Sequence, residues 1–279
     1  MIGTVALPDG TAVARLGQGT WRMGEGRQTR AREADALRLG MDFGMTLIDT
    51  AEMYADGGAE EVVADALVGR RETAFVVSKV VPSNATRSGV LAACDRSLAR
   101  LRIDAIDLYL LHWSGRTPIA ETIEGFERLR AAGKIRRWGV SNLDVPAMQV
   151  MATARDGSDC ATDQVLYNLG SRGIEFDLLP WCADRKIPVM AYSPVGQAGA
   201  LLRHPALRAI AERHGATPAQ VAIAWTLRHP GIISIPKASD PAHVRENAAA
   251  ADLVLTEADR AELDTAFTPP ARATDLEML

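Results

Sequence analysis

The sequence predicts an α/β protein, a (β/α)8 TIM barrel with an N-terminal β-hairpin and extra helices. Eight short apolar runs alternate with stretches of helical periodicity along the 279 residues. A barrel of this kind takes about 250 residues, and an open sheet of eight parallel strands would leave edges to protect. A doubly wound sheet is the structural alternative. Because no linker or repeat interrupts the alternation, we expect residues 1–279 to form a single barrel domain.

The expected strands follow an N-terminal hairpin that turns at Asp9-Gly10, a pair that favours tight turns. Each strand is a short apolar run of the kind that parallel sheets bury on both faces. The runs lie near Leu16 and at residues 46–49, 74–79, 106–112, 135–141, 162–166, 188–193 and 231–236.

The expected helices present apolar residues on one stripe and have recognisable first turns. Thr86, Thr217 and Asp240 are candidate N-caps, the last two followed by proline. The stripe in residues 86–102 consists of Val90, Leu91, Cys94, Leu98 and Leu101. The helices are expected at 30–43, 58–68, 86–102, 119–132, 144–155, 175–185, 204–214, 217–228, 240–250 and 256–266. Two of them fall between the last two strands, which suggests an inserted element.

Composition argues against several classes of protein. Hydrophobic residues at 47% and charged residues at 24% are ordinary for a globular chain, and no apolar run reaches the roughly 18 residues that span a bilayer. A net charge of -4 provides no basic field for nucleic acid. The start MIGTVALPDG has no basic segment followed by an apolar stretch, so we expect no secretory signal. Three cysteines without a CxxC pair fit reduced thiols, and hence a cytoplasmic protein.

Four polar side chains follow consecutive predicted strands where each run ends: Asp49, Tyr54, Lys79 and His112. The carboxyl ends of parallel strands share one face, and ligands bind there. Taken singly, each residue has an ordinary explanation: a turn cap, a packing tyrosine, a solvated lysine and a core imidazole. Their joint occurrence on three consecutive strands favours a shared site.

These four side chains suit the protonation of an oxygen that gains negative charge, such as a carbonyl that receives a hydride. Lys79 beside Tyr54 should lower the pKa of the phenol from its usual value of about 10. Asp49 is expected to form a buried ion pair with Lys79, and His112 supplies an N–H at the same oxygen. A positioned general acid typically contributes on the order of 10² to 10⁴ in rate.

Further motifs extend this pattern along nearly the whole chain. They are GQGTW at 17–21, LIDTAEMY at 47–54, VSK at 77–79, LYLLHW at 108–113, GKIRRWGVSN at 133–142, DQVLYN at 163–168, AYSPVG at 191–196 and IPKASDPAHVREN at 235–247. In this combination and order the chain resembles the aldo-keto reductase superfamily, most closely the bacterial members that reduce small aldehydes, methylglyoxal and diketo-sugar acids. The resemblance implies a monomer with an (α/β)8 barrel that binds NADPH without a Rossmann domain. No GxGxxG opens a helix here.

The resemblance implies roles for the four side chains and a set of cofactor residues. Tyr54 would donate the proton, Lys79 and Asp49 would adjust the pKa of Tyr54, and His112 would orient the carbonyl. Substrate would contact Trp21, Tyr54, His112 and Trp113. The cofactor residues would be Gly19, Thr20, Asp49, Ser141, Asn142, Gln164, Tyr192, Ser193, Pro194, Val195, Gly196, Lys237, Ala238, Ser239, His243, Glu246 and Asn247.

Among these residues, Ser141, Asn142 and Gln164 would hold the nicotinamide carboxamide, which needs both donors and acceptors. Tyr192 would stack on the ring. Residues 193–196 would pass under the pyrophosphate, although a plain turn at Ser-Pro is the competing explanation.

The sequence departs from the family pattern at the 2′-phosphate end. Ala238 stands where a serine is usual, and His243 where an arginine commonly binds the phosphate. Arginine is always charged and bidentate, which histidine at neutral pH is not. Arg245 lies nearly opposite His243 on a helix and is no simple substitute. We therefore expect NADPH preference with reduced discrimination against NADH.

The expected substrate is a small carbonyl compound such as methylglyoxal or a keto-sugar acid. Val81 replaces a tryptophan of some relatives, and the chain ends soon after Pro270, so we expect a more open site. Two other functions stay open. A metal-dependent barrel hydrolase is disfavoured because the five histidines form no HxH or HExxH pair, and we expect no metal. A non-catalytic NADPH-sensing interaction module would keep the same four side chains.

Overall fold

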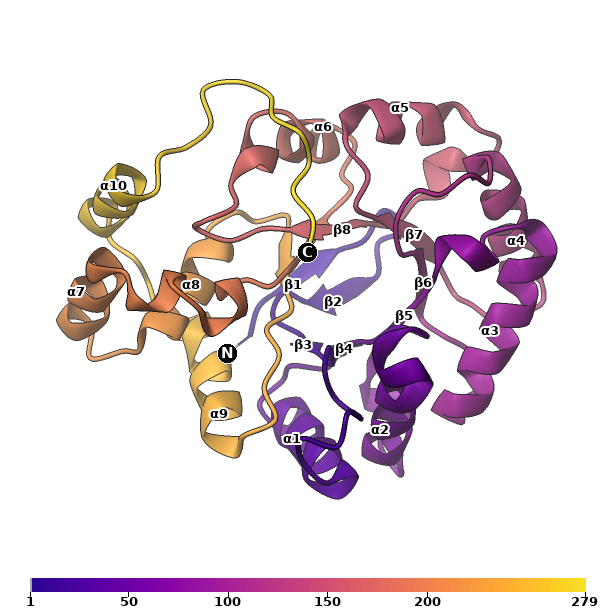
Figure 1. The fold of residues 1–279 in the computed structure, drawn as a ribbon, viewed down its shortest axis with the longest axis horizontal. Helices are drawn as coiled ribbons and strands as arrows, with labels where there is room; N and C mark the ends of the chain where they lie inside the picture. Colours follow the sequence, from indigo (N-terminus) through magenta and orange to yellow (C-terminus); the bar gives the residue numbers. More distant parts are fainter. Residues whose placement is uncertain (1) are drawn as a thin grey trace.

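The parallel sheet of the protein closes into a barrel (Figure 1). In the computed structural model, which describes residues 2–279, strands β3 to β10 pair in parallel in the order of the chain. They are β3 (Gln18–Gly19), β4 (Leu47–Asp49), β5 (Phe75–Val80), β6 (Leu108–Leu111), β7 (Trp138–Ser141), β8 (Asp163–Leu166), β9 (Val189–Tyr192) and β10 (Ile232–Ser234). Leu16 and Gly19 bridge to Ser234 and Lys237, which joins the first strand to the last. The barrel is confirmed, and the doubly wound alternative is wrong.

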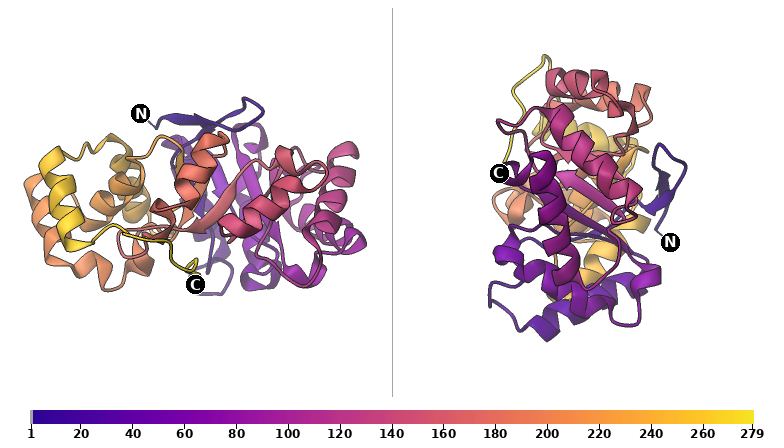
Figure 2. Two further views of the ribbon diagram at one scale, coloured as in Figure 1. Left: turned by 90° about the horizontal axis from the view of Figure 1, so that it is seen from above. Right: turned by 90° about the vertical axis from the view of Figure 1, so that its right-hand side faces the viewer.

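The N-terminal hairpin covers one end of the barrel. Strands β1 (Thr4–Ala6) and β2 (Ala12–Ala14) are antiparallel and turn where predicted, with Gly10 at φ 85°. Leu7 and Val13 are buried in one cluster with the apolar side chains of the strands, so the hairpin seals this end. Figure 2 shows the hairpin and the C-terminus at opposite ends of the barrel.

All ten predicted helices are present. They are α1 (Arg30–Asp42), α2 (Gly58–Leu67), α3 (Arg87–Leu101), α4 (Ile119–Ala131), α5 (Val145–Thr153), α6 (Leu178–Asp184), α7 (Pro205–Arg213), α8 (Pro218–Thr226), α9 (Pro241–Ala249) and α10 (Glu257–Ala266). Thr86, Thr217 and Asp240 cap their helices as predicted. Helix α6 begins later than expected because Pro180, which lacks an N–H, belongs in a first turn.

Helix α3 differs in detail from its predicted stripe. Val90, Cys94 and Leu101 are buried, whereas Leu91 and Leu98 are only half-buried. Ala93 and Ser97 complete the buried face. The difference arises because α3 packs against both α2 and α4, so its buried face is centred between two neighbouring helices.

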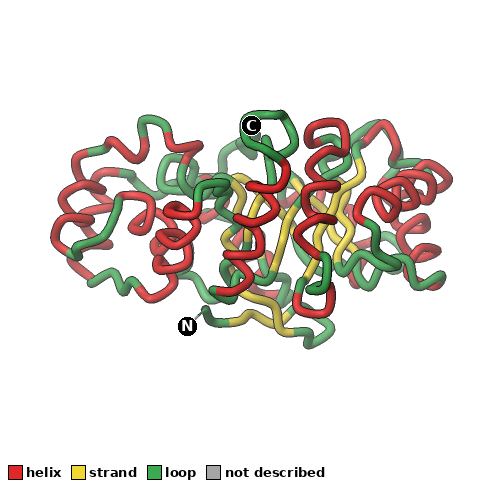
Figure 3. Tube along the Cα trace, turned by 90° about the horizontal axis from the view of Figure 1, so that it is seen from below, coloured by secondary structure: helices red, strands yellow, loops and turns green. Residues whose placement is uncertain are grey.

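Helices α7 and α10 lie together at one side of the ring (Figure 1), and Figure 3 shows helices on both sides of the strands. Arg213 and His214 both contact the buried carboxylate of Asp259, His214 at 2.7 Å. The two helices between β9 and β10 confirm the predicted inserted element. Within residues 2–279 no helix is both long and apolar enough to cross a membrane.

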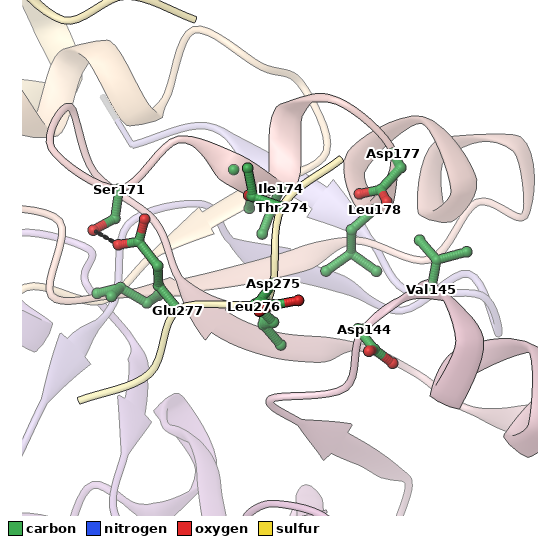
Figure 4. Close-up of a pocket in the computed structure, with 12 residues that line it drawn as sticks. Asp144, Val145, Ser171, Ile174, Asp177, Leu178, Thr274, Asp275, Leu276 and Glu277 are labelled. Atoms are coloured by element: carbon green, nitrogen blue, oxygen red, sulfur yellow. Dashed lines mark hydrogen bonds between the residues drawn. The ribbon is translucent and has the colours of Figure 1, made fainter. Parts of the chain in front are cut away.

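The C-terminal tail, residues 267–279, returns across the barrel end opposite the hairpin (Figures 1 and 2). Leu276 packs against the core, and Ser171 Oγ donates a hydrogen bond to Glu277 Oε2 at 2.7 Å (Figure 4). The backbone of Leu279 lies close enough to the Tyr192 hydroxyl to oppose the rise of its pKa that burial causes. A short tail was expected to leave the mouth more open, but this one is long enough to reach the mouth.

Candidate active site

The structure brings Asp49, Tyr54, Lys79 and His112, here called the tetrad, to one end of the barrel. Lys79 Nζ donates to Asp49 Oδ2 at 2.8 Å, to the backbone oxygen of Thr50 at 2.8 Å and to the Tyr54 hydroxyl at 3.2 Å. The imidazole of His112 lies edge-on to the Tyr54 ring, with 5.7 Å between ring centroids. The side chains come from β4, β5 and the segments that follow β4 and β6, because side chains at these strand ends face the same opening.

The ammonium of Lys79 is fully buried, and its bonds decide the charges of the tetrad. Burial alone would lower the pKa of Lys79, but Asp49 and Tyr54 hold it above its usual value. Burial raises the pKa of Asp49, and Lys79 and Gln164 oppose this shift. We therefore describe the pair as a lysine ammonium facing a buried carboxylate.

The expected direction of the Tyr54 pKa is wrong. Burial raises the pKa of the phenol, while Lys79 acts in the opposite direction and does not outweigh it. The negative charge of Asp49 also works against a phenolate and weakens the effect of Lys79. Tyr54 is consequently protonated at neutral pH and has a proton to donate.

His112 is a neutral imidazole in this setting. Burial and the nearby Lys79 charge lower its pKa to about 2. Its ring packs on Trp113 with 4.8 Å between centroids, and its Nδ1 is buried with no hydrogen-bond partner among residues 2–279. A neutral imidazole retains one N–H, which can donate to a carbonyl oxygen without adding charge.

Polar side chains on or just after β7, β8 and β9 form a connected network beside the tetrad. Gln164 Nε2 donates to Asp49 Oδ1 at 2.7 Å, which links this network to the tetrad directly. Ser141 Oγ donates to the backbone oxygen of Gln164 at 2.7 Å. Tyr192 OH donates to Asn142 Oδ1 at 3.0 Å, and Asn142 Nδ2 donates to the backbone oxygen of His112 at 3.1 Å.

Residues 193–196 follow Tyr192 in a tight turn. Ser193 has φ 49° and Gly196 φ 58°, and Gly196 N donates to the Ser193 oxygen at 3.0 Å. Asn168 Nδ2 donates to the same Ser193 oxygen at 3.0 Å and holds the turn against β8. Pro194 is buried, and Val195 is half-buried. This turn agrees with the Ser-Pro alternative and leaves the pyrophosphate role a prediction.

Near the first strand, the predicted cofactor residues Gly19 and Thr20 are both buried. Thr20 N donates to the Asp49 backbone oxygen at 3.0 Å. Thr20 Oγ1 is a buried hydroxyl with no hydrogen-bond partner in residues 2–279. A buried hydroxyl of this kind has a donor and acceptors available for a ligand.

The segment predicted to bind the 2′-phosphate, residues 237–247 and here called the phosphate segment, is more exposed than the tetrad. Lys237 Nζ donates to Ser239 Oγ at 2.5 Å, and both residues are half-buried, as is Ala238. His243 is exposed on α9, whereas Asn247 is buried and Glu246 half-buried. Arg245 donates to the Pro241 oxygen of its own helix at 3.2 Å, in agreement with the prediction that it does not replace an arginine at 243.

Comparison with known proteins assigns the chain to a family. The profile described as Aldo/keto reductase family matches residues 15–267. The chain belongs to this family. It is 52% identical over 281 residues to the methylglyoxal reductase YeaE of Escherichia coli (strain K12), covering 99% of this chain and 97% of the relative. Glyoxal reductase of Bacillus subtilis (strain 168) is 32% identical, over 94% of this chain and 91% of the relative.

Among solved structures, an aldo-keto reductase from Klebsiella pneumoniae in complex with NADPH matches with a TM-score of 0.97 and 51% identity, over 100% of both chains. These comparisons confirm the resemblance drawn from the motifs. The protein is therefore an aldo-keto reductase, an oxidoreductase of carbonyl compounds.

The predicted aromatic residues of the reductase pocket differ in exposure. Trp21 is 40% exposed, and the Arg22 guanidinium lies 4.2 Å from its ring centroid. Trp113 is half-buried against His112. The described residues contain no group of three or more His, Cys, Asp and Glu side chains that could hold a metal ion.

Several residues around the site of this reductase were not anticipated from the sequence. Glu52 accepts hydrogen bonds from Val81 N and Asn84 Nδ2, each at 3.0 Å, and so holds the loop after β5. The fully buried Glu60 pairs with the half-buried Arg100, which lies against Gly57 in the loop after Tyr54. The Gly57-Gly58 dipeptide after Tyr54 was a local signal for close packing, but nothing in the sequence names the partner.

Proposed function

We propose that this reductase transfers a hydride from NADPH to small aldehydes and ketones, with Tyr54 as the proton donor. The substrates would be short dicarbonyls such as methylglyoxal, or keto-sugar acids. The observation that carries the proposal is the contact of 3.2 Å between Lys79 Nζ and the Tyr54 hydroxyl. The relative described as a methylglyoxal reductase and the relative solved with NADPH support the choice of substrate and cofactor.

The residues at the strand ends fit a nicotinamide cofactor. Thr20 Oγ1 is buried without a partner among the residues that the structure describes. The hydroxyl and amide groups of Ser141, Asn142 and Gln164 lie in the network that joins β7 and β8 to Asp49 and His112. Such groups match the donors and acceptors of a carboxamide. Tyr192 would hold the nicotinamide ring, and Lys237 with Ser239 would hold the 2′-phosphate. Bound NADPH would supply the hydride.

The residues of the chain would handle the proton. The N–H of neutral His112 would donate to the carbonyl oxygen and orient it. As that oxygen gains negative charge, it would take the proton of the Tyr54 hydroxyl, so that one O–H bond breaks and another forms. The phenolate left on Tyr54 would be stabilised by the Lys79 ammonium and would regain a proton from solvent.

Two features near the tetrad support a small substrate. Trp21 and Trp113 provide aromatic surface, and the C-terminal tail reaches Tyr192. A three-carbon dicarbonyl needs little space beside the tetrad.

The three cysteines are buried free thiols, which supports the expected cytoplasmic location.

Replacement of Tyr54 by phenylalanine tests the proposal. We expect kcat with methylglyoxal to fall on the order of 10² to 10⁴-fold, because only the donated proton is lost. The Kd for NADPH, measured by fluorescence titration, should change little. Tyr167→Phe is the matched control. The Tyr167 hydroxyl donates to Glu175 Oε1, with 2.6 Å between the two oxygens, and is not part of the tetrad.

Two outcomes would contradict the proposal. If the wild-type protein oxidises NADPH with none of methylglyoxal, phenylglyoxal and nitrobenzaldehyde, the protein is not a small-carbonyl reductase. In that case NADPH binding without turnover would favour the alternative, a non-catalytic NADPH-sensing module. If Tyr54→Phe turns over like Tyr167→Phe, another group donates the proton.

A further inference from the structure

The Tyr54 hydroxyl is carried by a loop with an unfavourable backbone conformation. Ala55 (φ 50°) and Asp56 (φ 53°) are both left-handed, and Gly57 follows at φ 89°. Residues other than glycine rarely adopt this region, and two in succession need support from the surrounding structure. The structure that surrounds the loop must therefore hold it in place.

Arg100 of α3 lies directly against this loop. A Cβ atom placed on Gly57 would fall 2.5 Å from both Cδ and Nε of Arg100. Only the missing side chain of Gly57 lets the guanidinium approach the backbone so closely. The glycine therefore serves two needs, the positive φ and the room for Arg100.

The guanidinium of Arg100 is held by a buried carboxylate. Arg100 Nε donates to Glu60 Oε2 at 2.6 Å, and Glu60 is fully buried in the first turn of α2. The other carboxylate oxygen accepts a hydrogen bond from Ser78 Oγ at 2.6 Å. A buried carboxylate with both oxygens bonded has a fixed position.

Ser78 connects Glu60 and Arg100 to the strand that carries Lys79. It precedes Lys79 on β5, and successive side chains of a strand point to opposite faces. Lys79 thus faces the barrel interior and Tyr54, while Ser78 faces α2 and Glu60. Strand β5, which carries Lys79, and the loop that carries Tyr54 are therefore connected outside the barrel. The contacts run from Ser78 to Glu60, from Glu60 to Arg100 and from Arg100 to Gly57.

We propose that Arg100 is a positioning residue for Tyr54: fixed by Glu60, its guanidinium holds the 54–57 loop so that the Tyr54 hydroxyl stays against Lys79 Nζ. This inference rests on the proposed role of Tyr54 as proton donor. Arg100 touches neither substrate nor cofactor and acts only through the loop.

A second ion pair, between the residue that caps the C-terminal end of α3 and helix α2, provides a control. Arg102, two residues after Arg100, binds Asp65 of α2 at 2.5 Å. Arg102 is exposed and Asp65 half-buried, and the atoms nearest to a Cβ on Gly57 all belong to Arg100. Arg102→Met therefore removes one cation and one α2–α3 ion pair without changing the support of the loop.

Arg100→Met should lower kcat by about 10²-fold, since a misplacement of about 1 Å is enough for such a loss. The KM for methylglyoxal and the Kd for NADPH should stay near the wild-type values. Arg102→Met should stay within about twofold of wild type in all three quantities, because exposed pairs contribute little. Glu60→Gln should also lower kcat, but by a smaller factor than Arg100→Met, because a glutamine can still accept the hydrogen bond from Ser78.

The pH profile of kcat separates positioning from a loss of folded protein. Lys79 favours the phenolate, so a Tyr54 that moves away from Lys79 loses its proton only at higher pH. The alkaline limb of kcat should therefore move to higher pH in Arg100→Met and in Glu60→Gln. A merely structural role would lower the amount of active enzyme and leave the profile in place.

The outcomes distinguish this inference from the proposed function. If Tyr54→Phe abolishes turnover but Arg100→Met behaves like Arg102→Met, the positioning role is wrong. An unchanged pH profile with a reduced kcat also overturns it. If Tyr54→Phe retains turnover, the proposed function fails instead. If Arg100→Met does not fold, the pH profiles of kcat for Glu60→Gln and Arg100→Lys distinguish the same outcomes.

Discussion

The tetrad and the phosphate segment of this reductase are built in different ways. Lys79 is fully buried, and three hydrogen bonds fix its ammonium, one of them to the Tyr54 hydroxyl. In the phosphate segment, Lys237 is half-buried and bonds Ser239, and His243 is exposed. The tetrad is therefore rigidly specified, whereas the segment proposed to select the cofactor consists of side chains that can change independently.

The physical reason for this difference is the surrounding dielectric. Charges in a buried site interact strongly, so every member depends on the others. Exposed charges are screened by water and salt, so each contributes little to stability. A change in the tetrad should thus affect folding as well as chemistry, and a change in the phosphate segment should affect cofactor selectivity alone.

The largest effect is expected for Lys79→Met, which leaves the buried carboxylate of Asp49 without its ion partner. The free energy of unfolding should fall by about 3–5 kcal/mol, as for other buried pairs that lose one member. Urea unfolding followed by circular dichroism measures this change. Adding Asp49→Asn should restore much of the loss. A single variant as stable as wild type would show that the tetrad is not coupled to folding.

A smaller effect is expected for His243→Arg in the phosphate segment. A bidentate guanidinium should increase the ratio of kcat/KM for NADPH over NADH by about tenfold, or about 1.4 kcal/mol, through the 2′-phosphate. The free energy of unfolding should stay within about 0.5 kcal/mol of wild type, because the site is exposed. Steady-state kinetics with both cofactors measure the ratio. An unchanged ratio, or a loss of stability, would contradict the contrast between the two regions.

The smallest effect is expected from truncation after Leu276, which removes the Ser171 bond to Glu277 and the Leu279 contact to Tyr192. The last residues of a chain contribute little to stability, so unfolding should change by less than about 0.5 kcal/mol. The KM for a bulky aldehyde such as nitrobenzaldehyde should fall, while that for methylglyoxal stays nearly constant. Equal changes for both aldehydes would show that the tail does not limit access.

Much of the fold followed from local patterns, and the reason can be seen in particular residues. Thr86, Thr217 and Asp240 cap helices because their side chains satisfy N–H groups only two or three residues away. The ends of the strands could also be predicted from local sequence, because each strand is a continuous apolar run. Helix α3 shows the limit: its buried face depended on two neighbouring helices, and Ser97 was missed.

The sequence by itself determined which chemical groups stand at the strand ends, because their order along the chain and the alternation of strands and helices are local properties. Only the tertiary structure decided how these groups act on one another. It showed that burial outweighs Lys79 at the Tyr54 phenol, that the C-terminal tail reaches Tyr192, and that Arg100 packs on Gly57. Desolvation and contact distance depend on segments far apart in the chain, and no local pattern records them.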